Sequence, residues 1–120
     1  MVPEEPFTDE RPWGNFRQYC HGESVTVKTI FVKKGARLSL QYHHGRDEFW
    51  HVISGTPEVT IGTTVTDASP GDEFEISRAT LHRIGAPRGD ALFLEISRGN
   101  FDETDIVRVE DEYGRAKKKT

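Results

Sequence analysis

Residues 38–52, LSLQYHHGRDEFWHV, place amide, imidazole and carboxylate groups among residues that otherwise favour a β-strand. Side chains alternate between the two faces of a strand, so Gln41 and His43 point to the same face. Glu48 begins the next strand segment, and His82 lies far downstream in ATLHRIG. Two imidazoles, an amide oxygen and a carboxylate are a mixed ligand set that divalent metals accept. The pattern predicts a metal site with four protein ligands: Gln41, His43, Glu48 and His82.

The metal's identity stays open, because Zn, Mn, Fe, Co and Ni all tolerate these ligands. The alternative interpretation is that the adjacent histidines, His43 and His44, lie at a solvated strand end. That alternative does not account for the positions of Gln41 and Glu48. Four protein ligands on a metal that accepts five or six leave open positions, which favours catalysis over a structural role.

The rest of the chain is typical of an all-β protein. The segment SVTVKTIFV (24–32) is dense in β-branched residues, and no segment of ten or more residues has a helical period. Gly62-Thr63 fits a tight hairpin, and Pro70-Gly71 fits a type II turn because glycine accepts positive φ at its second central position. The other expected strands are RLSLQYH, EFWHVIS, PEVTI, TVTDA, EFEI, LHRI, ALFLEIS and DIVRV. About eight to ten strands without helical crossovers predict an antiparallel sandwich or barrel.

Length and composition indicate a single globular domain in a chain of 120 residues. The net charge of −4 argues against a nucleic-acid surface, and no apolar run is long enough to cross a bilayer. A single cysteine excludes an internal disulfide, so we expect a cytoplasmic protein. We expect an N-terminal arm at residues 1–10, the folded domain at 11–115 and a flexible basic tail at 116–120.

Spacing around the four polar residues resembles the two signature blocks of the cupin superfamily, which are G-x5-H-x-H-x(3,4)-E-x6-G and G-x5-P-x-G-x2-H. The first block runs from Gly35 to Gly55 and the second from Gly71 to His82. Gln41 stands where the first histidine usually lies. In the second block the usual proline and glycine are replaced by Ser77 and Ala79, so the turn that leads to the last ligand is expected to differ slightly in shape.

A closer resemblance is to the type II mannose-6-phosphate isomerase cupin, whose hallmark is near PGxxLSLQxHxHRxEHWxVVxG with glutamine as the normal first ligand. It covers residues 11–115, through RPWG (11–14), KTIFVKKGARLSLQYHHGRDEFWHVISG (28–55), GDEFEISRATLHRIGAP (71–87) and DIVRVEDEYGR (105–115). It implies a double-stranded β-helix, or jelly-roll barrel, holding a divalent metal. It also implies a small-molecule sugar phosphate as substrate, and cupins as a class suggest a homodimer.

The implied reaction interconverts mannose 6-phosphate and fructose 6-phosphate, which requires a group that moves a proton between two carbons. Glu48 is the first candidate for this group, and Glu95 and His44 are the others. Lys28 and Arg46 match basic positions of the family and are the candidates for contacts with phosphate or sugar hydroxyls. Arg83 and Arg108 are lesser candidates for the same contacts.

Two departures from the family pattern keep other functions open. Gly45 replaces the third histidine of QxHHHR, and Phe49 replaces the histidine of EHW. If either histidine handles substrate or protons, that role is vacant here, and a non-catalytic module that binds metal and sugar phosphate is then an alternative. A different cupin enzyme, such as an oxygenase or a sugar epimerase, is the other alternative, because fold does not fix function.

Overall fold

The computed structural model describes residues 6–21, 25–99 and 105–111. The secondary-structure elements of these residues are all β-strands. The strands are β1 (Phe7–Arg11), β2 (Gly14–His21), β3 (Val25–Val32), β4 (Leu40–His43), β5 (Arg46–Ser54), β6 (Glu58–Ile61), β7 (Thr64–Asp67), β8 (Glu73–Ile76), β9 (His82–Gly85), β10 (Ala91–Gly99) and β11 (Ile106–Glu110). The predicted all-β class is therefore confirmed.

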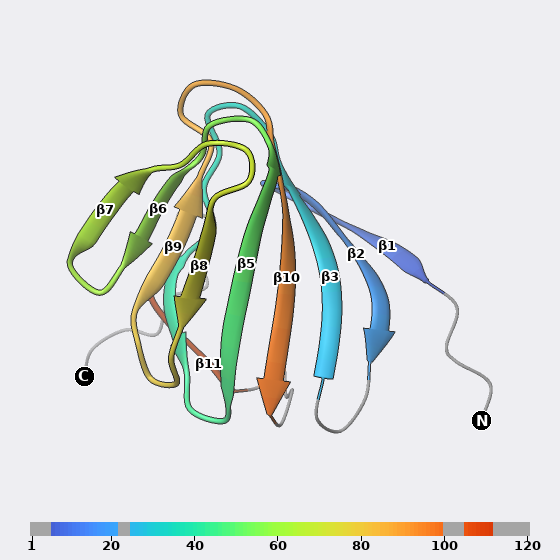
Figure 1. The fold of residues 1–120 in the computed structure, drawn as a ribbon, viewed down its shortest axis with the longest axis vertical. Coiled ribbons are helices and arrows are strands. Elements are labelled where there is room, and N and C mark those ends of the chain that lie inside the picture. The colour runs from blue at the N-terminus through green and yellow to red at the C-terminus, as the bar shows by residue number, and fades with distance from the viewer. Residues whose placement is uncertain (1–5, 22–24, 100–104, 112–120) are drawn as a thin grey trace.

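Two antiparallel sheets face each other and form the walls of a barrel-like sandwich (Figure 1). One sheet has the order β1-β2-β3-β10-β5-β8, and the other has the order β11-β4-β9-β6-β7. Within each sheet, strands from distant parts of the chain are neighbours, as in β3-β10-β5 and β4-β9-β6. This topology brings the two sequence blocks of the predicted metal site together.

The first two strands are absent from the sequence-based prediction. FTDER and GNFRQYCH lack the density of β-branched residues that marks the later strands. They form a strand pair because their backbones pair with each other and with β3. Strand β1 overlaps the predicted N-terminal arm (1–10), while the predicted tail (116–120) lies outside the described residues.

Two predicted turns have the expected backbone. Ile61 pairs with Thr64 across a two-residue hairpin, and Gly62 has φ +60°. Gly71 has φ +91°, the positive value that the second central position of a type II turn requires. The first turn fixes the register of β6 and β7, and the second leads the chain from β7 in one sheet to β8 in the other.

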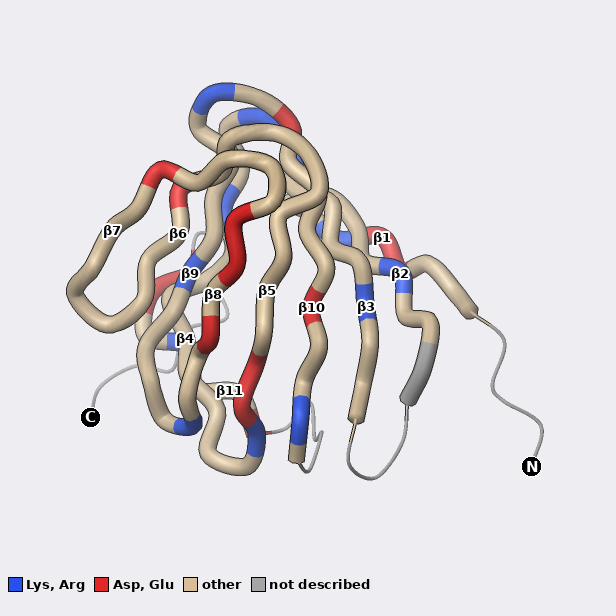
Figure 2. Tube along the Cα trace, in the orientation of Figure 1, with Lys and Arg blue, Asp and Glu red and all other residues tan. Residues whose placement is uncertain are grey.

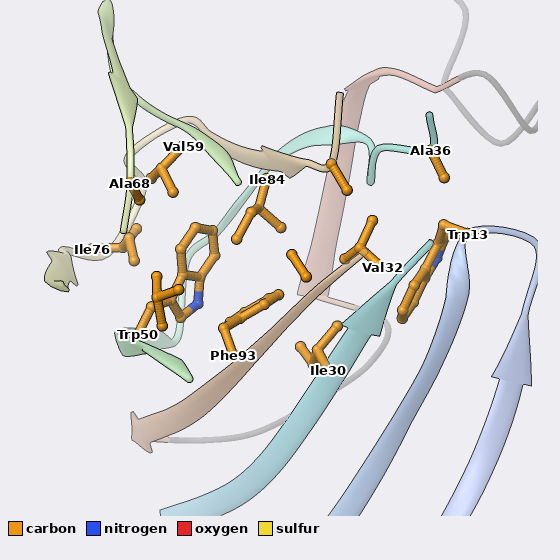
Figure 3. Close-up of a cluster of buried hydrophobic side chains, with 13 residues drawn as sticks. Trp13, Ile30, Val32, Ala36, Trp50, Val59, Ala68, Ile76, Ile84 and Phe93 are labelled. Atoms are coloured by element: carbon orange, nitrogen blue, oxygen red, sulfur yellow. The ribbon is translucent and has the colours of Figure 1, made fainter. Parts of the chain in front are cut away.

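The interior divides into an apolar end and a polar end. In β3, β5 and β10, buried side chains alternate with half-buried ones, as in strands that face inward on one side. At one end the buried residues are apolar and join the core, in which Trp50 lies beside Phe93 (Figure 3). At the other end the buried residues of these strands are polar: Thr26, Lys28, Arg46, Glu48, Glu95 and Ser97. Buried polar side chains need hydrogen-bond or ion-pair partners inside the protein, so this polar end is the candidate for the functional site.

Charged residues of both signs occur along β5 and β10, and acidic positions lie along β8 (Figure 2). Within the described residues there is no helix long and apolar enough to cross a membrane.

Candidate metal centre and adjoining cavity

The position of His43 is set by the short hairpin between β4 and β5. The Asp105 carboxylate accepts hydrogen bonds from the backbone N–H groups of Gly45 (2.7 Å) and His44 (3.1 Å), which ties this turn to β11. The Asp105 backbone carbonyl lies 3.4 Å from His43 Nδ1. A carbonyl can only accept, so Nδ1 carries the proton and Nε2 presents a lone pair to the interior.

His82 is oriented in the same way from the start of β9. Its Nδ1 donates to the Thr80 carbonyl over 2.9 Å, while its buried Nε2 has no hydrogen-bond partner in the described structure. Burial lowers the pKa of His82 and outweighs the opposing charge of Glu48, so the imidazole is neutral near pH 7. A neutral histidine that donates one N–H to a carbonyl and directs the other nitrogen to an open position is arranged as a metal ligand.

Glu48 lies between the two histidines. Its Oε2 is 2.9 Å from His43 Nε2 and 3.8 Å from His82 Nε2. Burial alone would raise the pKa of Glu48, but its close contact with His43 and the hydrogen bond from Glu95 hold that pKa well below its ordinary value. The carboxylate is therefore ionised, as a metal ligand must be.

These three side chains fit a divalent metal. One ligand atom from each lies within 4.8 Å of the other two, and all three residues are buried. Two atoms each about 2.1 Å from one ion lie about 3 Å apart at a right angle and about 4.2 Å apart when opposite. The distances from Glu48 Oε2 to His43 Nε2 (2.9 Å) and to His82 Nε2 (3.8 Å) are close to this range. The partnerless His82 Nε2 independently indicates a missing ligand.

Gln41, the fourth predicted ligand, lines the cavity beside His43 and Glu48. It is directly opposite His82 in the β4–β9 pairing. Residues directly opposite in an antiparallel pair point to the same face of the sheet. The sequence-based alternation is thus consistent with the fold, and the amide lies on the same face as the histidine.

A second carboxyl group, Glu95, adjoins the centre. Trp50 Nε1 donates to Glu48 Oε1 (3.1 Å) and to Glu95 Oε1 (3.3 Å), so one indole bridges both groups. Burial and the neighbouring charge of Glu48 raise the pKa of Glu95 well above its ordinary value. The two carboxyl groups therefore differ in protonation, with Glu48 ionised and Glu95 neutral.

An open cavity adjoins these groups, with about 610 Å³ of empty space including the part that is continuous with solvent. Lys28 and Arg46, predicted as substrate contacts, line it together with Glu95. Arg108, a lesser candidate, lines it as well, whereas Arg83 instead donates to the Leu38 carbonyl and is not among the lining residues.

One further candidate, His44, and the two departures from the family pattern lie away from the cavity lining. His44 is exposed in the β4–β5 turn, with its ring edge-on to Tyr42 at 5.2 Å. Phe49 alternates with the buried Glu48 and Trp50 and so faces the outer side of its sheet. Gly45 forms the turn held by Asp105. The two departures from the family pattern are therefore outside the described cavity wall.

Sequence reasoning missed several residues of the site. Trp50 was not among the candidates named from the sequence, and its indole N–H is the bridge between the carboxyl groups. Arg11 lines the cavity because β1, itself unpredicted, places it there. The bond between Asp105 and the β4–β5 turn joins residues about 60 positions apart, and no local pattern marks such a contact.

The sequence is similar to parts of longer bacterial biosynthetic proteins. Xanthan biosynthesis protein XanB of Xanthomonas campestris pv. campestris (strain B100) is 44% identical over 107 residues, which are 88% of this chain and 23% of that protein. Alginate biosynthesis protein AlgA of Pseudomonas aeruginosa is 42% identical over 107 residues, 88% of this chain and 22% of that protein. The chain thus spans less than a quarter of each of these relatives.

The fold is shared with solved structures that are 21% and 22% identical in sequence to this chain. Oxalate decarboxylase from Bacillus subtilis aligns with a TM-score of 0.78 at 21% identity, over 91% of this chain and 33% of that one. KdgF from Halomonas sp. aligns with a TM-score of 0.71 at 22% identity, over 84% of this chain and 91% of that one. At these identities the likeness concerns the fold alone.

A family match covers almost the whole folded region. Residues 5–111 match the family described as mannose-6-phosphate isomerase C-terminal. Together with the two-sheet jelly roll and the metal-ligand arrangement on its inner face, this match establishes that the chain belongs to the mannose-6-phosphate isomerase C-terminal family and has the cupin fold.

Proposed function

We propose that this domain interconverts mannose 6-phosphate and fructose 6-phosphate with a divalent metal held by four side chains: Gln41, His43, Glu48 and His82. The family match and the two inward-directed histidines support this assignment. When bound, the metal would supply Lewis-acid stabilisation of the negative charge that develops on the substrate oxygens. The homodimer and the cytoplasmic location stay predictions.

Glu95 is the group that we assign to proton transfer between C2 and C1. This assignment replaces our first candidate, Glu48, because Glu48 is ionised and lies between the two histidines. A raised pKa brings proton exchange by Glu95 closer to neutral pH, where a general base is most effective. Its carboxylate form takes the proton from one carbon, and the resulting acid returns it to the other. The observation that carries the proposal is this pair of buried carboxyl groups, which the indole N–H of Trp50 joins beside the two histidines.

Lys28 and Arg46 would bind sugar hydroxyls near the reacting carbons. Lys28 is opposite Glu95 in the β3–β10 pairing, and Arg46 Nε donates to Glu48 Oε2 over 3.3 Å. Both cations are buried, so they hold the carboxyl groups in place and stabilise negative charge near them.

The competing function is a module that binds metal and sugar phosphate without turnover. It was motivated by Gly45 and Phe49, which replace histidines of the family pattern. Both positions lie outside the described cavity lining, so these replacements leave the proposed catalytic groups untouched. This placement favours the isomerase over the binding module.

Glu95→Gln tests the isomerase directly. The amide keeps the size of the carboxyl group and can still accept the Trp50 hydrogen bond, but it cannot transfer the proton. We expect turnover of mannose 6-phosphate to fructose 6-phosphate to fall at least about 100-fold, within the usual contribution of a general base, with metal content unchanged. The measurement is an assay coupled to fructose 6-phosphate formation. Binding without turnover by the metal-loaded wild type would instead identify the binding module.

A further inference from the structure

The turn between β4 and β5 connects the two sheets at the metal centre. His43 ends β4 in the five-stranded sheet, and Arg46 begins β5 in the six-stranded sheet. His44 and Gly45 make up the whole connection. The geometry of this short turn therefore determines how His43 is placed relative to Glu48, which lies on the other wall with its Oε2 2.9 Å from His43 Nε2.

The carboxylate of Asp105, a residue from a distant part of the chain, holds this turn. Its Oδ2 accepts hydrogen bonds from the backbone N–H groups of both turn residues, Gly45 at 2.7 Å and His44 at 3.1 Å. Hydrogen bonds to an ionised group are stronger than those between neutral groups. Asp105 immediately precedes β11, whose first residue, Ile106, is opposite His43 in the β11–β4 pairing. The carboxylate thus fixes the main chain of its own residue beside His43.

The main-chain carbonyl of Asp105 and the carboxylate of Glu48 lie at the two nitrogens of the His43 ring. The carbonyl is 3.4 Å from Nδ1, and Glu48 Oε2 is 2.9 Å from Nε2. A neutral imidazole has one N–H to donate. If Nε2 carries the proton, His43 donates to Glu48, and two groups that should hold the metal satisfy each other. If Nδ1 carries it, the Asp105 carbonyl accepts the proton and both ligand atoms stay available to the metal.

We propose that Asp105 is a positioning residue of the metal centre: its carboxylate holds its own carbonyl where that carbonyl accepts the Nδ1–H of His43, which leaves Nε2 for the metal. His82 obtains the same arrangement locally, because its Nδ1 donates to the carbonyl of Thr80 two residues earlier. The partner of His43 is 62 positions away in the sequence and needs a separate tie to stay in place. The inference rests on the metal centre of the proposed function and is independent of the isomerase reaction.

The test compares the Zn²⁺ affinity of wild type with that of full-length variants, by titration against a competing chelator. Asp105→Ala removes the carboxylate, and we expect the dissociation constant for Zn²⁺ to rise about 10- to 100-fold, the usual effect of losing a group that orients a metal-bound histidine. Asp105→Glu displaces the carboxylate by one methylene group and should also weaken binding. Asp105→Asn keeps an acceptor oxygen for the two N–H groups and should recover most of the loss.

Asp90→Ala is the matched control. The Asp90 carboxylate accepts a hydrogen bond from the backbone N–H of Lys34 over 2.8 Å, across 56 positions of the sequence, and neither residue lines the cavity. This variant loses the same kind of long-range tie without a contact to His43. Its Zn²⁺ affinity should equal that of wild type.

Nuclear magnetic resonance of the Zn²⁺-loaded proteins separates positioning of the ring from a general loss of stability. A ring N–H that a carbonyl accepts is protected from exchange with water and gives its own proton signal. We expect such signals from the Nδ1–H groups of His43 and His82 in wild type and in Asp105→Asn. In Asp105→Ala the His43 signal should disappear through exchange, while the His82 signal stays as the internal reference.

The outcomes separate this inference from the proposed function. Unchanged Zn²⁺ affinity in Asp105→Ala and Asp105→Glu, or a His43 signal that persists in Asp105→Ala, overturns the positioning role and leaves the metal centre standing. Equal weakening by Asp90→Ala assigns the effect to stability and overturns it too. If wild type binds neither Zn²⁺ nor Mn²⁺, the metal centre fails and this inference with it. The expected affinities without any turnover of mannose 6-phosphate support the positioning role and contradict only the isomerase.

Discussion

The indole N–H of Trp50 joins the two carboxyl groups on which the proposed chemistry depends. It donates to Glu48 and Glu95, and its ring meets that of His82 edge-on at 5.5 Å. Replacing a group that orients a metal ligand typically weakens metal affinity 10- to 100-fold. We therefore expect Trp50→Phe, which keeps an aromatic ring but loses the N–H, to weaken metal binding by about tenfold.

Metal titration followed by calorimetry checks this expectation, with Trp13→Phe as the matched control. Trp13 lies at the opposite end of the apolar core from Trp50 (Figure 3). Both variants lose one buried indole, but only the first loses the bridge to Glu48. Equal metal affinity in the two variants would show that Trp50 acts by packing alone.

The raised pKa of Glu95 has a consequence for stability in the metal-free protein. Between the ordinary value of 4.5 and the raised value, the folded state binds more protons than the unfolded state. The free energy of unfolding therefore decreases as pH rises through this range. Glu95→Gln lacks this decrease, so its stability relative to wild type should increase from pH 5 to pH 8.

Urea denaturation of metal-free protein at several pH values measures this difference. Glu48 does not contribute to this difference between pH 5 and pH 8. Because its pKa is lowered, its contribution to the free energy of unfolding is lost only as pH falls below the ordinary value of 4.5. Glu75→Gln is the control, since Glu75 is exposed on β8. A constant difference between Glu95→Gln and wild type would mean that Glu95 is not held neutral.

At the scale of elements, the turn that leads to His82 contains a conformation that glycine normally adopts. Ala79, which stands where the cupin pattern has glycine, has φ +62°, and its N–H donates to the His43 carbonyl over 2.6 Å. An L-residue in this region costs about 1–2 kcal/mol, while glycine costs about 0.5–1 kcal/mol in the unfolded chain. Because Ala79 is exposed, Ala79→Gly should stabilise the protein by about 0.5–1 kcal/mol.

Chemical denaturation tests this prediction, and Ala68→Gly provides the contrast. Ala68 is 1% exposed in the core, so its replacement removes buried apolar surface and should destabilise the protein. Loss of stability in both variants would indicate that the turn at Ala79 does not carry the strain we describe.

Elements near the site were predictable from the sequence where the signal lay within a few consecutive residues. Alternation along β4 placed Gln41 and His43 on one face of the strand, and glycine positions marked the hairpin at Gly62. The pair β1 and β2 was not predictable in this way, because its strands are held by pairing with β3 rather than by β-branched residues. Arg11 was missed for the same reason.

At the scale of the whole molecule, contacts between residues far apart in the sequence set the properties of the site residues, and composition does not reveal these contacts. The neutral state of Glu95 depends on Glu48 in the neighbouring strand β5, and the orientation of His43 depends on Asp105 from β11. The family resemblance supplied the fold and the four ligand positions, whereas the division of the interior into apolar and polar ends appeared only in three dimensions. That division leaves a buried, charged centre beside an open cavity.

Such a centre should couple metal binding to folding. A ligand that binds only the folded state stabilises it by about 2.7 kcal/mol at 100 times its dissociation constant. His82→Ala removes the imidazole whose Nε2 has no partner in the described structure, and it should abolish this stabilisation. His51→Ala is the control, since His51 pairs with Glu73 at the sheet surface.

Metal content of the purified proteins, measured by mass spectrometry with the fold checked by circular dichroism, tests the central claim most directly. We predict one divalent ion per chain in wild type and in His51→Ala, and only a small fraction of an ion in folded His82→Ala. Stoichiometric metal in folded His82→Ala would contradict the assignment of this centre.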